Sequence, residues 1–564
     1  MSRYGYDPKG MDALIQSARG LIPADLLVQN ASVFNPFTLE WEDTSFTVCN
    51  GRIAGYGNKP ARAEIDLGGA PVVPGFIDAH LHIESSLLTP TEYSRLVIKH
   101  GTTTIIADPH EIANVCGIQG VTYMLDARTR TDVDVLIMLP SCVPATSLDE
   151  SFELLDAARL APLINHNGIV GLGEMMNVPG VLGQSPDVME KINLTNICDG
   201  HAPMLSGADL DAYVAAGIQS DHETITNAEG LEKLRRGMFL FIREGSTEHN
   251  IRELISLVNL RTVGRCSFCT DDRHVDMLVS AGHIDDCIRT AICTGLEPEL
   301  AYRMASLSPA ERFGLNDRGA LSPGRIADFS VLDDVNRCIV RQTFRKGVAV
   351  LDPGYHPAPP CSYVFRSRVP CPDEIEINGN GIARVIGLIP GQIATESLSL
   401  PVRGDDIPDT GRDILKVVSA SRYDDSRVGV GLVHGMQLKE GAIACSIAHD
   451  GHHLMAVGVD DADIISACKE VIRHRGGMVC VYNEKCQVLP LDCAGLMADA
   501  PYEKVFDQFN SLMGLTEKTG AINNPFMYLS FLSLTVIPAL RITPSGVFDA
   551  SSFAPASLFL TRSD

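Results

Sequence analysis

Between Pro71 and Arg273 a short apolar run recurs about every 20–35 residues, and this spacing constrains the fold more than any other feature of the chain. The stretches between the runs have helical character. Eight such runs occur: PVVPGFIDAHLH, GTTTIIADPHE, VDVLIMLPSC, GIVGLGEMM, TNICDGHAP, GIQSDHET, GMFLFIREGS and RCSFCTDD. Parallel strands buried on both faces read as continuous apolar runs, so eight of them alternating with helices predict a (β/α)8 barrel. A doubly wound sheet is the alternative, but no Gly-rich dinucleotide loop supports it.

The segments on either side of this region have the texture of a small β-domain. Residues 24–70 alternate short apolar runs with Asn, Gly and Pro turn signals, and GRIADFSVLDD (324–334) and RQTFRKGVAVLDPG (341–354) repeat the pattern. We therefore predict a composite β-domain made of residues 1–70 and 321–360, with the barrel at 71–320 between its two parts. After a Pro-rich linker, residues 375–564 predict a separate C-terminal α/β domain.

Charge and cysteine usage limit the class of protein. The net charge of −24 repels phosphate backbones, so we expect no nucleic-acid partner. Sixteen cysteines in 564 residues are too few for a disulfide scaffold, and the N-terminus lacks a secretory signal pattern, which favours a reduced, cytoplasmic protein. The apolar stretch at 525–542 is interrupted by Ser, Thr and Pro, so we expect it to be core and expect no membrane partner.

Polar residues follow most of the apolar runs at the same point, where a strand gives way to a loop. The carboxyl ends of barrel strands share one face, so these side chains are predicted to converge in space. They are His80 and His82, Asp108 with His110 and Glu111, Glu174, His201, His222, Glu244, and Asp271 with Asp272.

The pair His80 and His82 is the sharpest of these features. Residues two apart on a strand point to the same side, so both imidazoles can reach one ion. An HxH pair also occurs by chance in loops, and the further strand-end ligands, with His201 and His222 among them, are what favour a metal centre. Four imidazoles with carboxylates and no obvious thiolate suit Zn, Fe or Mn. The remaining histidines are interpreted as core or surface residues: His100, His166, His249, His283, His356 and His474.

Two acidic residues extend this centre. No lysine occurs from Asp132 through Glu190, which excludes at the fourth strand the carboxylated lysine that bridges two ions in one group of such barrels. The carboxylate of Glu174 is available there and could bridge ions about 3.5–4 Å apart, with capping of the next helix as the alternative. Asp271 is predicted to ligate one ion and accept a proton from water, and Asp272 stays open because a strand end is not fixed to one residue.

Several segments together resemble the amidohydrolase superfamily and, more narrowly, the bacterial adenine deaminases: PGFIDAHLHIESS, ADPHEIANVCG, GLGEMMNVPGV, DGHAP, SDHE, SFCTDDRH and GALSPGRIADFSVLDD. The resemblance covers nearly the whole chain. It implies a distorted (β/α)8 barrel, a role in purine salvage and adenine catabolism, and hydrolytic deamination of adenine to hypoxanthine and ammonia. The resemblance further implies metal-activated hydroxide at a binuclear centre, with manganese as the expected ion and iron or zinc as alternatives.

Carried over residue by residue, the resemblance assigns six metal-site positions: His80, His82, Glu174, His201, His222 and Asp271. Asp271 is expected to pass the proton of the hydroxide to the departing amine. The sequence lacks the HxxE run by which other deaminases of the superfamily protonate the ring, and it lacks the H-x-E and P-C-x-x-C signature of the zinc deaminases. We therefore expect Glu111, with Asp108 or His110, to serve ring N1. The alternative for this segment is a turn at Asp108 and a helix cap.

The sequence is also compatible with other functions. Hydrolysis of a cyclic amide or an N-acyl bond is the alternative within the superfamily, since the same attack serves C=O as well as C–NH2. An inactive barrel scaffold is the alternative from another class, but such a protein would be expected to have lost ligands. A small purine base is the expected substrate, and a homodimer is the expected assembly.

The run SIAHDGHH at 446–453 brings four polar residues together in the C-terminal domain: His449, Asp450, His452 and His453. We predict a solvated turn here. A second ion site or a lid over the barrel mouth are the alternatives.

Overall fold

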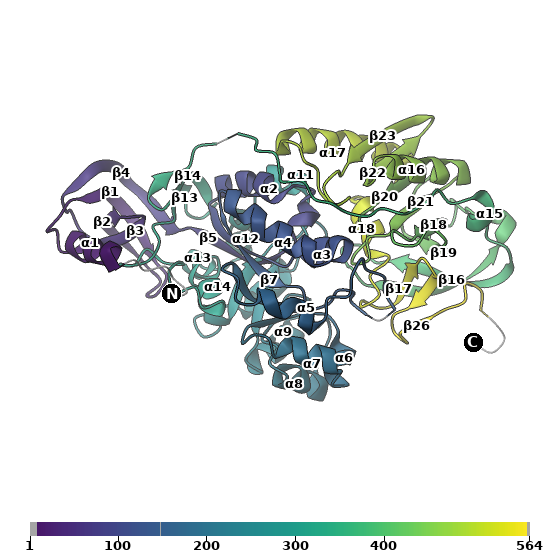
Figure 1. Cartoon of the computed structure of the whole chain (residues 1–564), viewed down its shortest axis with the longest axis horizontal. Helices are drawn as coiled ribbons and strands as arrows, with labels where there is room; N and C mark the ends of the chain where they lie inside the picture. Colours follow the sequence, from purple (N-terminus) through teal and green to yellow (C-terminus); the bar gives the residue numbers. More distant parts are fainter. Residues whose placement is uncertain (1–7, 147, 353, 561–564) are drawn as a thin grey trace.

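The computed structural model describes residues 8–146, 148–352 and 354–560. A β-domain, a barrel and a C-terminal domain follow one another along the long axis of the molecule (Figure 1). The chain passes from the first to the second and back before it enters the third.

The barrel contains all eight predicted strands. They are β5 (Phe76–Leu81), β6 (Thr102–Ala107), β7 (Asp134–Leu139), β8 (Ile169–Met175), β9 (Cys198–Gly200), β10 (Ser220–Asp221), β11 (Phe239–Arg243) and β12 (Cys266–Cys269). Five form a parallel sheet in the order β5-β6-β7-β8-β9, and β10-β11-β12 form a second one. Gln219 N donates to Cys198 O at 3.1 Å, and Asp271 N donates to His80 O at 3.1 Å, so the two sheets meet on both sides. The predicted barrel class is therefore confirmed, in a distorted form.

Helices alternate with these strands and cover the barrel. They are α2 (Pro90–Val97), α3 (His110–Cys116), α4 (Ile118–Ala127), α5 (Ala157–Leu160), α6 (Val178–Leu182), α7 (Pro186–Ile192), α8 (Gly207–Ala215), α9 (Asn227–Arg235), α10 (Ile251–Leu254), α11 (Val275–Ser280), α12 (Ile284–Cys293), α13 (Pro298–Met304) and α14 (Leu307–Arg312). In α12 the buried apolar residues Ile284, Cys287, Ile288 and Ala291 recur at helical spacing and form one face against the strands.

The β-domain is one seven-stranded sheet built from both flanks of the barrel. Its order is β15-β14-β13-β4-β1-β2-β3, where β13 follows the barrel in the chain and β4 precedes it. These two strands pair antiparallel, with Phe329 opposite Pro74. The strands are β1 (Ala24–Asn35), β2 (Glu40–Cys49), β3 (Arg52–Tyr56), β4 (Ala61–Pro74), β13 (Phe329–Asp334), β14 (Ile339–Arg345) and β15 (Val348–Ala349), with α1 (Pro8–Ala18) beside them. The residue limits of the domains stay predictions.

The C-terminal domain is rich in strands. Its main sheet has the order β17-β16-β19-β18-β21-β20-β22-β23, and β24-β25-β26 form a small one. The strands are β16 (Asn380–Leu388), β17 (Thr395–Arg403), β18 (Ile414–Ala420), β19 (Val428–His434), β20 (Ala442–Cys445), β21 (Leu454–Gly458), β22 (Gly477–Tyr482), β23 (Lys485–Pro490), β24 (Leu540–Thr543), β25 (Gly546–Asp549) and β26 (Ala554–Pro555). The helices are α15 (Pro372–Ile375), α16 (Asp461–Arg473), α17 (Tyr502–Thr516) and α18 (Pro525–Phe531).

This domain packs against the barrel. Helix α17 contacts α2 and α11, and Ala498 N donates to Leu87 O at 2.8 Å. The apolar stretch at 525–542 forms α18 and leads into β24, with Phe526 and Leu529 buried, so the expectation that it is core is confirmed. Among the described residues, no helix has the length and apolar character needed to span a membrane.

Candidate functional site

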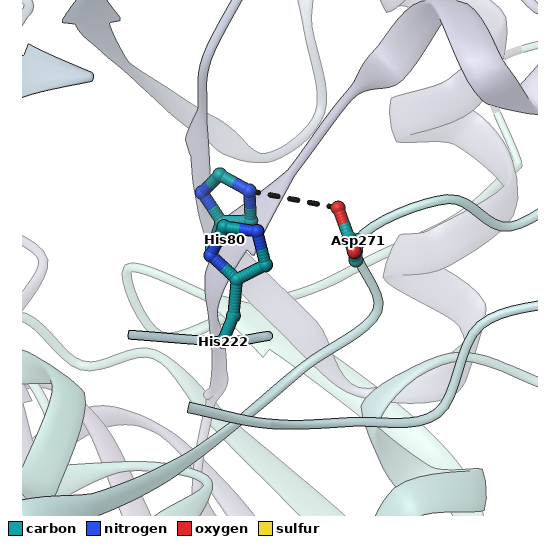
Figure 2. Close-up of side chains that lie close together, drawn as sticks. All are labelled: His80, His222 and Asp271. Carbon is teal, nitrogen blue, oxygen red and sulfur yellow. Dashed lines mark ion pairs between the residues drawn. The ribbon is translucent and has the colours of Figure 1, made fainter. Parts of the chain in front are cut away.

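Six of the residues predicted at strand ends lie together in the barrel. They come from the ends of five strands, and each is at most 5% exposed: His80, His82, Glu174, His201, His222 and Asp271. The His80 and His222 rings stack with centroids 4.1 Å apart. Figure 2 shows these two rings side by side, with the His80 imidazole facing the Asp271 carboxylate. The closed barrel therefore brings together residues that lie up to about 190 positions apart in the sequence.

The two oxygens of Glu174 face different histidines. Oε1 lies 3.2 Å from His82 Nε2 and 3.7 Å from His80 Nε2. Oε2 lies 2.7 Å from His201 Nδ1 and 3.2 Å from His222 Nε2. Burial opposes ionisation of this carboxyl, but His222 and His201 outweigh it and hold the pKa of Glu174 well below its usual range. The carboxylate is therefore an anion between two pairs of imidazoles, which is the arrangement of a bridging ligand.

Asp271 is held on one side by an arginine. Its Oδ1 lies 3.3 Å from His82 Nε2 and 3.5 Å from His80 Nε2, while its Oδ2 accepts a hydrogen bond of 2.8 Å from Arg243 Nη1. The backbone of Asp271 has φ 54°, a left-handed conformation that Asp tolerates better than most residues, and this turns the chain directly after β12. Arg243 also donates to Glu223 Oε2 at 2.9 Å. The Asp271 carboxylate is therefore fixed in orientation.

Asp108 contacts the backbone of the neighbouring strand. Its Oδ2 accepts a hydrogen bond of 2.9 Å from Glu174 N, and its Oδ1 lies 3.5 Å from His110 Nδ1. A Cβ added at Gly173 would lie 2.0 Å from Asp108 Oδ2, so only glycine fits at that position. Asp108 thus fixes the end of β8, from which Glu174 projects.

His110 lies between this cluster and Glu111. His110 Nδ1 is 3.5 Å from Glu174 Oε1, and His110 Nε2 is 3.5 Å from Glu111 Oε1. Both residues belong to the first turn of α3, which begins at His110. The segment at Asp108–Glu111 therefore begins a helix, as the alternative interpretation proposed. The side chains of His110 and Glu111 nevertheless point into the site.

The predicted solvated turn at 446–453 is wrong. His449 and His452 are 5% and 1% exposed, and each hydrogen-bonds one oxygen of Glu111, His449 through Nδ1 and His452 through Nε2. Asp450 Oδ1 lies 3.5 Å from His110 Nε2. Packing of the C-terminal domain on the barrel buries this segment. Its contact with Glu111 joins residues more than 300 positions apart, so no local sequence pattern indicates it.

The six clustered residues fit metal ions. Clusters able to hold an ion include His80 with His222 and Asp271, and Glu174 with His201 and His222. Within the described part of the chain, the buried atoms His80 Nε2 and His201 Nε2 have no hydrogen-bond partner. Ligand atoms about 2.0–2.2 Å from a shared ion lie roughly 3.0–3.5 Å apart, which is close to the separations found here. A buried imidazole nitrogen without a partner is costly, so the donor set is one that an ion would satisfy.

Comparison with known proteins agrees with this geometry. The Amidohydrolase family model matches residues 72–350, and the model named Adenine deaminase C-terminal domain matches residues 392–554. A protein named adenine deaminase from Methanoregula boonei is 54% identical over 548 residues, which cover 97% of this chain and 98% of the relative. The chain belongs to the adenine deaminase family. Another relative of that name, from Methanoculleus marisnigri, is 55% identical over 514 residues, 91% of this chain and 99% of its own.

The similarity to the adenine deaminase family also extends over the C-terminal domain. A relative named adenine deaminase from Desulfatibacillum aliphaticivorans is 43% identical over 97% of this chain and 99% of its own length. The amidohydrolase superfamily is metal-dependent, and the ion-sized clusters in the barrel are consistent with that property.

Glu244 and Asp272, the two remaining acidic strand-end residues, differ in their contacts. Glu244 was predicted to converge with the others, but its Oε1 pairs instead with His249 Nδ1 at 2.7 Å. Asp272 converges as predicted, since its carboxylate lies within 4.8 Å of ligand atoms of His82 and Asp271. It accepts a hydrogen bond from Ser85 Oγ, while Asp271 takes the position between His80 and His82.

Sequence reasoning also missed residues of this site. Arg243 is the last residue of β11, and Glu223 directly follows His222. The polarity of Arg243 at a strand end was a usable signal, because neighbouring strand positions alternate in direction and Glu244 cannot point the same way.

Proposed function

We propose that this protein is a hydrolytic adenine deaminase that converts adenine and water to hypoxanthine and ammonia with two divalent ions. The observation that carries this proposal is the two-sided carboxylate of Glu174, whose oxygens face separate histidine pairs in a chain 54% identical to a protein of that name.

Two sets of residues would hold the ions. His80 and His82 face Oε1 of Glu174 and also Oδ1 of Asp271, and His201 and His222 face Oε2 of Glu174. Imidazole and carboxylate donors suit manganese, iron and zinc, and we propose manganese first. When bound, such ions act as Lewis acids that make water nucleophilic at neutral pH.

We assign to Asp271 the role of proton carrier. Its Oδ1 faces the histidine nitrogens, where it can receive the proton of the attacking water and pass it to the leaving amine. Arg243 engages Oδ2 and thereby keeps Oδ1 turned inward. A positioned base of this kind contributes about 10²–10⁴-fold to the rate.

We assign to Glu111, acting with His110, the delivery of a proton to ring N1. Burial opposes a charge on Glu111, but His449 and His452 outweigh it and hold the pKa of Glu111 well below its usual range. Burial also opposes a charge on His449, and Glu111 outweighs it and raises the pKa of His449 to about 9. Glu111 and His449 therefore hold a proton between them at neutral pH.

Asp108 is proposed as a positioning residue. Its two oxygens meet Glu174 N and face His110 Nδ1, so it orients both the bridging carboxylate and the residue next to Glu111.

The cellular setting is also a proposal. All sixteen cysteines are free, which suits the reduced cytoplasm, and a free purine base in purine salvage suits a chain of net charge −24 that would repel polynucleotides. We propose a homodimer as the working assembly.

An assay of ammonia release tests the function. Metal-free protein is reconstituted separately with Mn, Fe and Zn and given adenine, a hydantoin, a lactam and an N-acyl amino acid. Adenine should give a kcat/KM at least about 10²-fold above the others. Turnover of an amide with no ammonia from adenine would contradict the proposal, and substoichiometric metal without hydrolysis would support an inactive scaffold.

A further inference from the structure

Three thiols meet where the barrel, the linker and the C-terminal domain touch. Cys116 is the last residue of α3, Cys361 lies in the irregular segment 354–371, and Cys493 follows β23. Cys116 Sγ and Cys361 Sγ are 3.7 Å apart, and Cys493 lies close enough to Cys361 to affect its acidity. This group belongs to no part of the proposed catalytic site.

The three thiols differ in access and in acidity. Cys116 and Cys493 are 2% and 5% exposed, whereas Cys361 is only half-buried. Hydrogen bonds from Cys116 and Cys493 lower the pKa of Cys361 to about 4, while the bond to Cys361 raises the pKa of each of the other two thiols. An accessible thiolate beside a buried thiol is the arrangement of an attacking and a resolving cysteine.

We propose that Cys361 and Cys116 form a reversible disulfide when the protein meets a small-molecule disulfide such as oxidised glutathione. The Cys361 thiolate attacks one sulfur of the reagent, forms a mixed disulfide and releases one reagent thiolate. Cys116 then loses its proton and attacks Cys361 Sγ, which releases the second reagent thiolate. Two protein thiols are oxidised to one disulfide, and the reagent is reduced to two thiols.

Cys116 rather than Cys493 is the partner because the two thiols differ in their hydrogen bonds. Cys493 Sγ donates its proton to Tyr123 Oη at 3.3 Å, whereas the contact of Cys116 is Cys361 itself. Once Cys361 is in a mixed disulfide, it carries no charge, and the largest cause of the raised pKa of both buried thiols disappears. Cys116 is then able to attack, while Cys493 stays hydrogen-bonded to Tyr123. The sulfurs must approach from 3.7 Å to about 2.05 Å, and Cys361 can move because no helix or strand holds it.

The bond would tie the linker to α3. The first turn of that helix carries His110 and Glu111, so the crosslink would lie at the opposite end of the element that positions them. The proposal concerns the bond alone and stands independently of the reaction that the barrel catalyses.

Thiol mapping on the full, metal-loaded protein tests this inference. The protein is incubated with oxidised glutathione, free thiols are alkylated, and peptides are analysed by mass spectrometry. A crosslinked peptide containing Cys116 and Cys361 should appear and disappear with dithiothreitol. In Cys116→Ser the mixed disulfide of Cys361 should accumulate, and in Cys361→Ser the thiol of Cys116 should stay reduced.

Exposed Cys486 supplies the matched control. Cys486→Ser should leave the crosslink unchanged. In wild type, partial desolvation raises the pKa of the Cys486 thiol, so the alkylation rate of Cys486 should fall about 100-fold from pH 7 to pH 5. Alkylation of Cys361 should change less than about 3-fold over the same range, because its thiolate persists. A crosslink of Cys361 to Cys493, a Cys361 that slows like Cys486, or a mixed disulfide that wild-type protein never resolves would overturn the proposal.

Discussion

Two buried groups of histidines and carboxylates in this molecule differ in spacing. In the barrel, His80 and His82 nitrogens stand 3.2–3.7 Å from carboxylate oxygens of Glu174 and Asp271. At the junction with the C-terminal domain, His449 and His452 hydrogen-bond Glu111 directly. The same residue types therefore leave room for ions in one place and share a proton in the other.

The difference teaches that residue type alone does not define a metal site. Burial is nearly equal in the two groups, since all these side chains are at most 5% exposed. What differs is whether buried nitrogens are left without a partner, as His80 Nε2 is in the described chain, or are satisfied by a carboxylate.

The largest effect is expected for Glu174→Gln. An amide cannot serve as a bridging anion between two imidazole pairs, so kcat/KM should fall on the order of 10⁴-fold and bound metal should fall by at least one equivalent. Steady-state kinetics and metal analysis measure both. Glu190→Gln, on the exposed face of α7, is the control. A Glu174→Gln protein with full metal content would contradict the role of Glu174 as a ligand that bridges ions in the barrel.

Glu111→Gln should lower kcat on the order of 10²–10³-fold with metal content unchanged. The reason is that the amide cannot take up and deliver a proton. Unchanged turnover with metal retained would remove Glu111 from the mechanism. Loss of metal would instead move Glu111 into the group that holds ions.

His452→Ala should lower kcat about 10–100-fold, with little change in KM or metal content, because the residue holds Glu111 in place and is not expected to touch substrate. His452→Gln, which can still donate a hydrogen bond, should restore part of the loss. His474→Ala in the same domain is the control, since that side chain is 32% exposed and faces Glu470. Equal kcat in His452→Ala and His474→Ala would contradict the assignment.

The smallest effect concerns pH. His449 faces the acidic groups Glu111, Asp272 and Asp450, and His452 and His274 lie close enough to interact with it. Because the pKa of His449 is raised to about 9, its proton is present below that pH and lost above it. In wild type, kcat should be flat between pH 7 and pH 8 and fall as pH rises through 9. In His449→Gln this alkaline fall should move by at least one pH unit, and an unchanged profile would exclude His449 as the group.

The barrel and the cluster of polar residues at its strand ends were predictable because both depend on local patterns. An apolar run followed by a polar residue marks a strand and its end, and this rule identified His80, Glu174 and His222 without knowledge of their neighbours. The rule failed at Glu244, because side chains of neighbouring strand residues point in opposite directions. Arg243 therefore reaches Asp271, and Glu244 pairs with His249.

The contact of the C-terminal domain with Glu111 was not predictable in the same way. His452 and Glu111 are 341 positions apart, and their meeting depends on how two domains pack, which no periodicity of either segment encodes. A run of four polar residues in five, as at 449–453, is read as solvent-exposed unless a partner surface is known.

Titration of metal-free protein with Mn²⁺ tests the central claim that the barrel residues hold ions and the C-terminal histidines hold Glu111. Ammonia release from adenine and bound metal are measured together, in wild type and in a variant carrying His449→Gln and His452→Gln. Both proteins should saturate at two bound equivalents, the variant with lower kcat. A third equivalent in wild type that the variant loses would contradict the account.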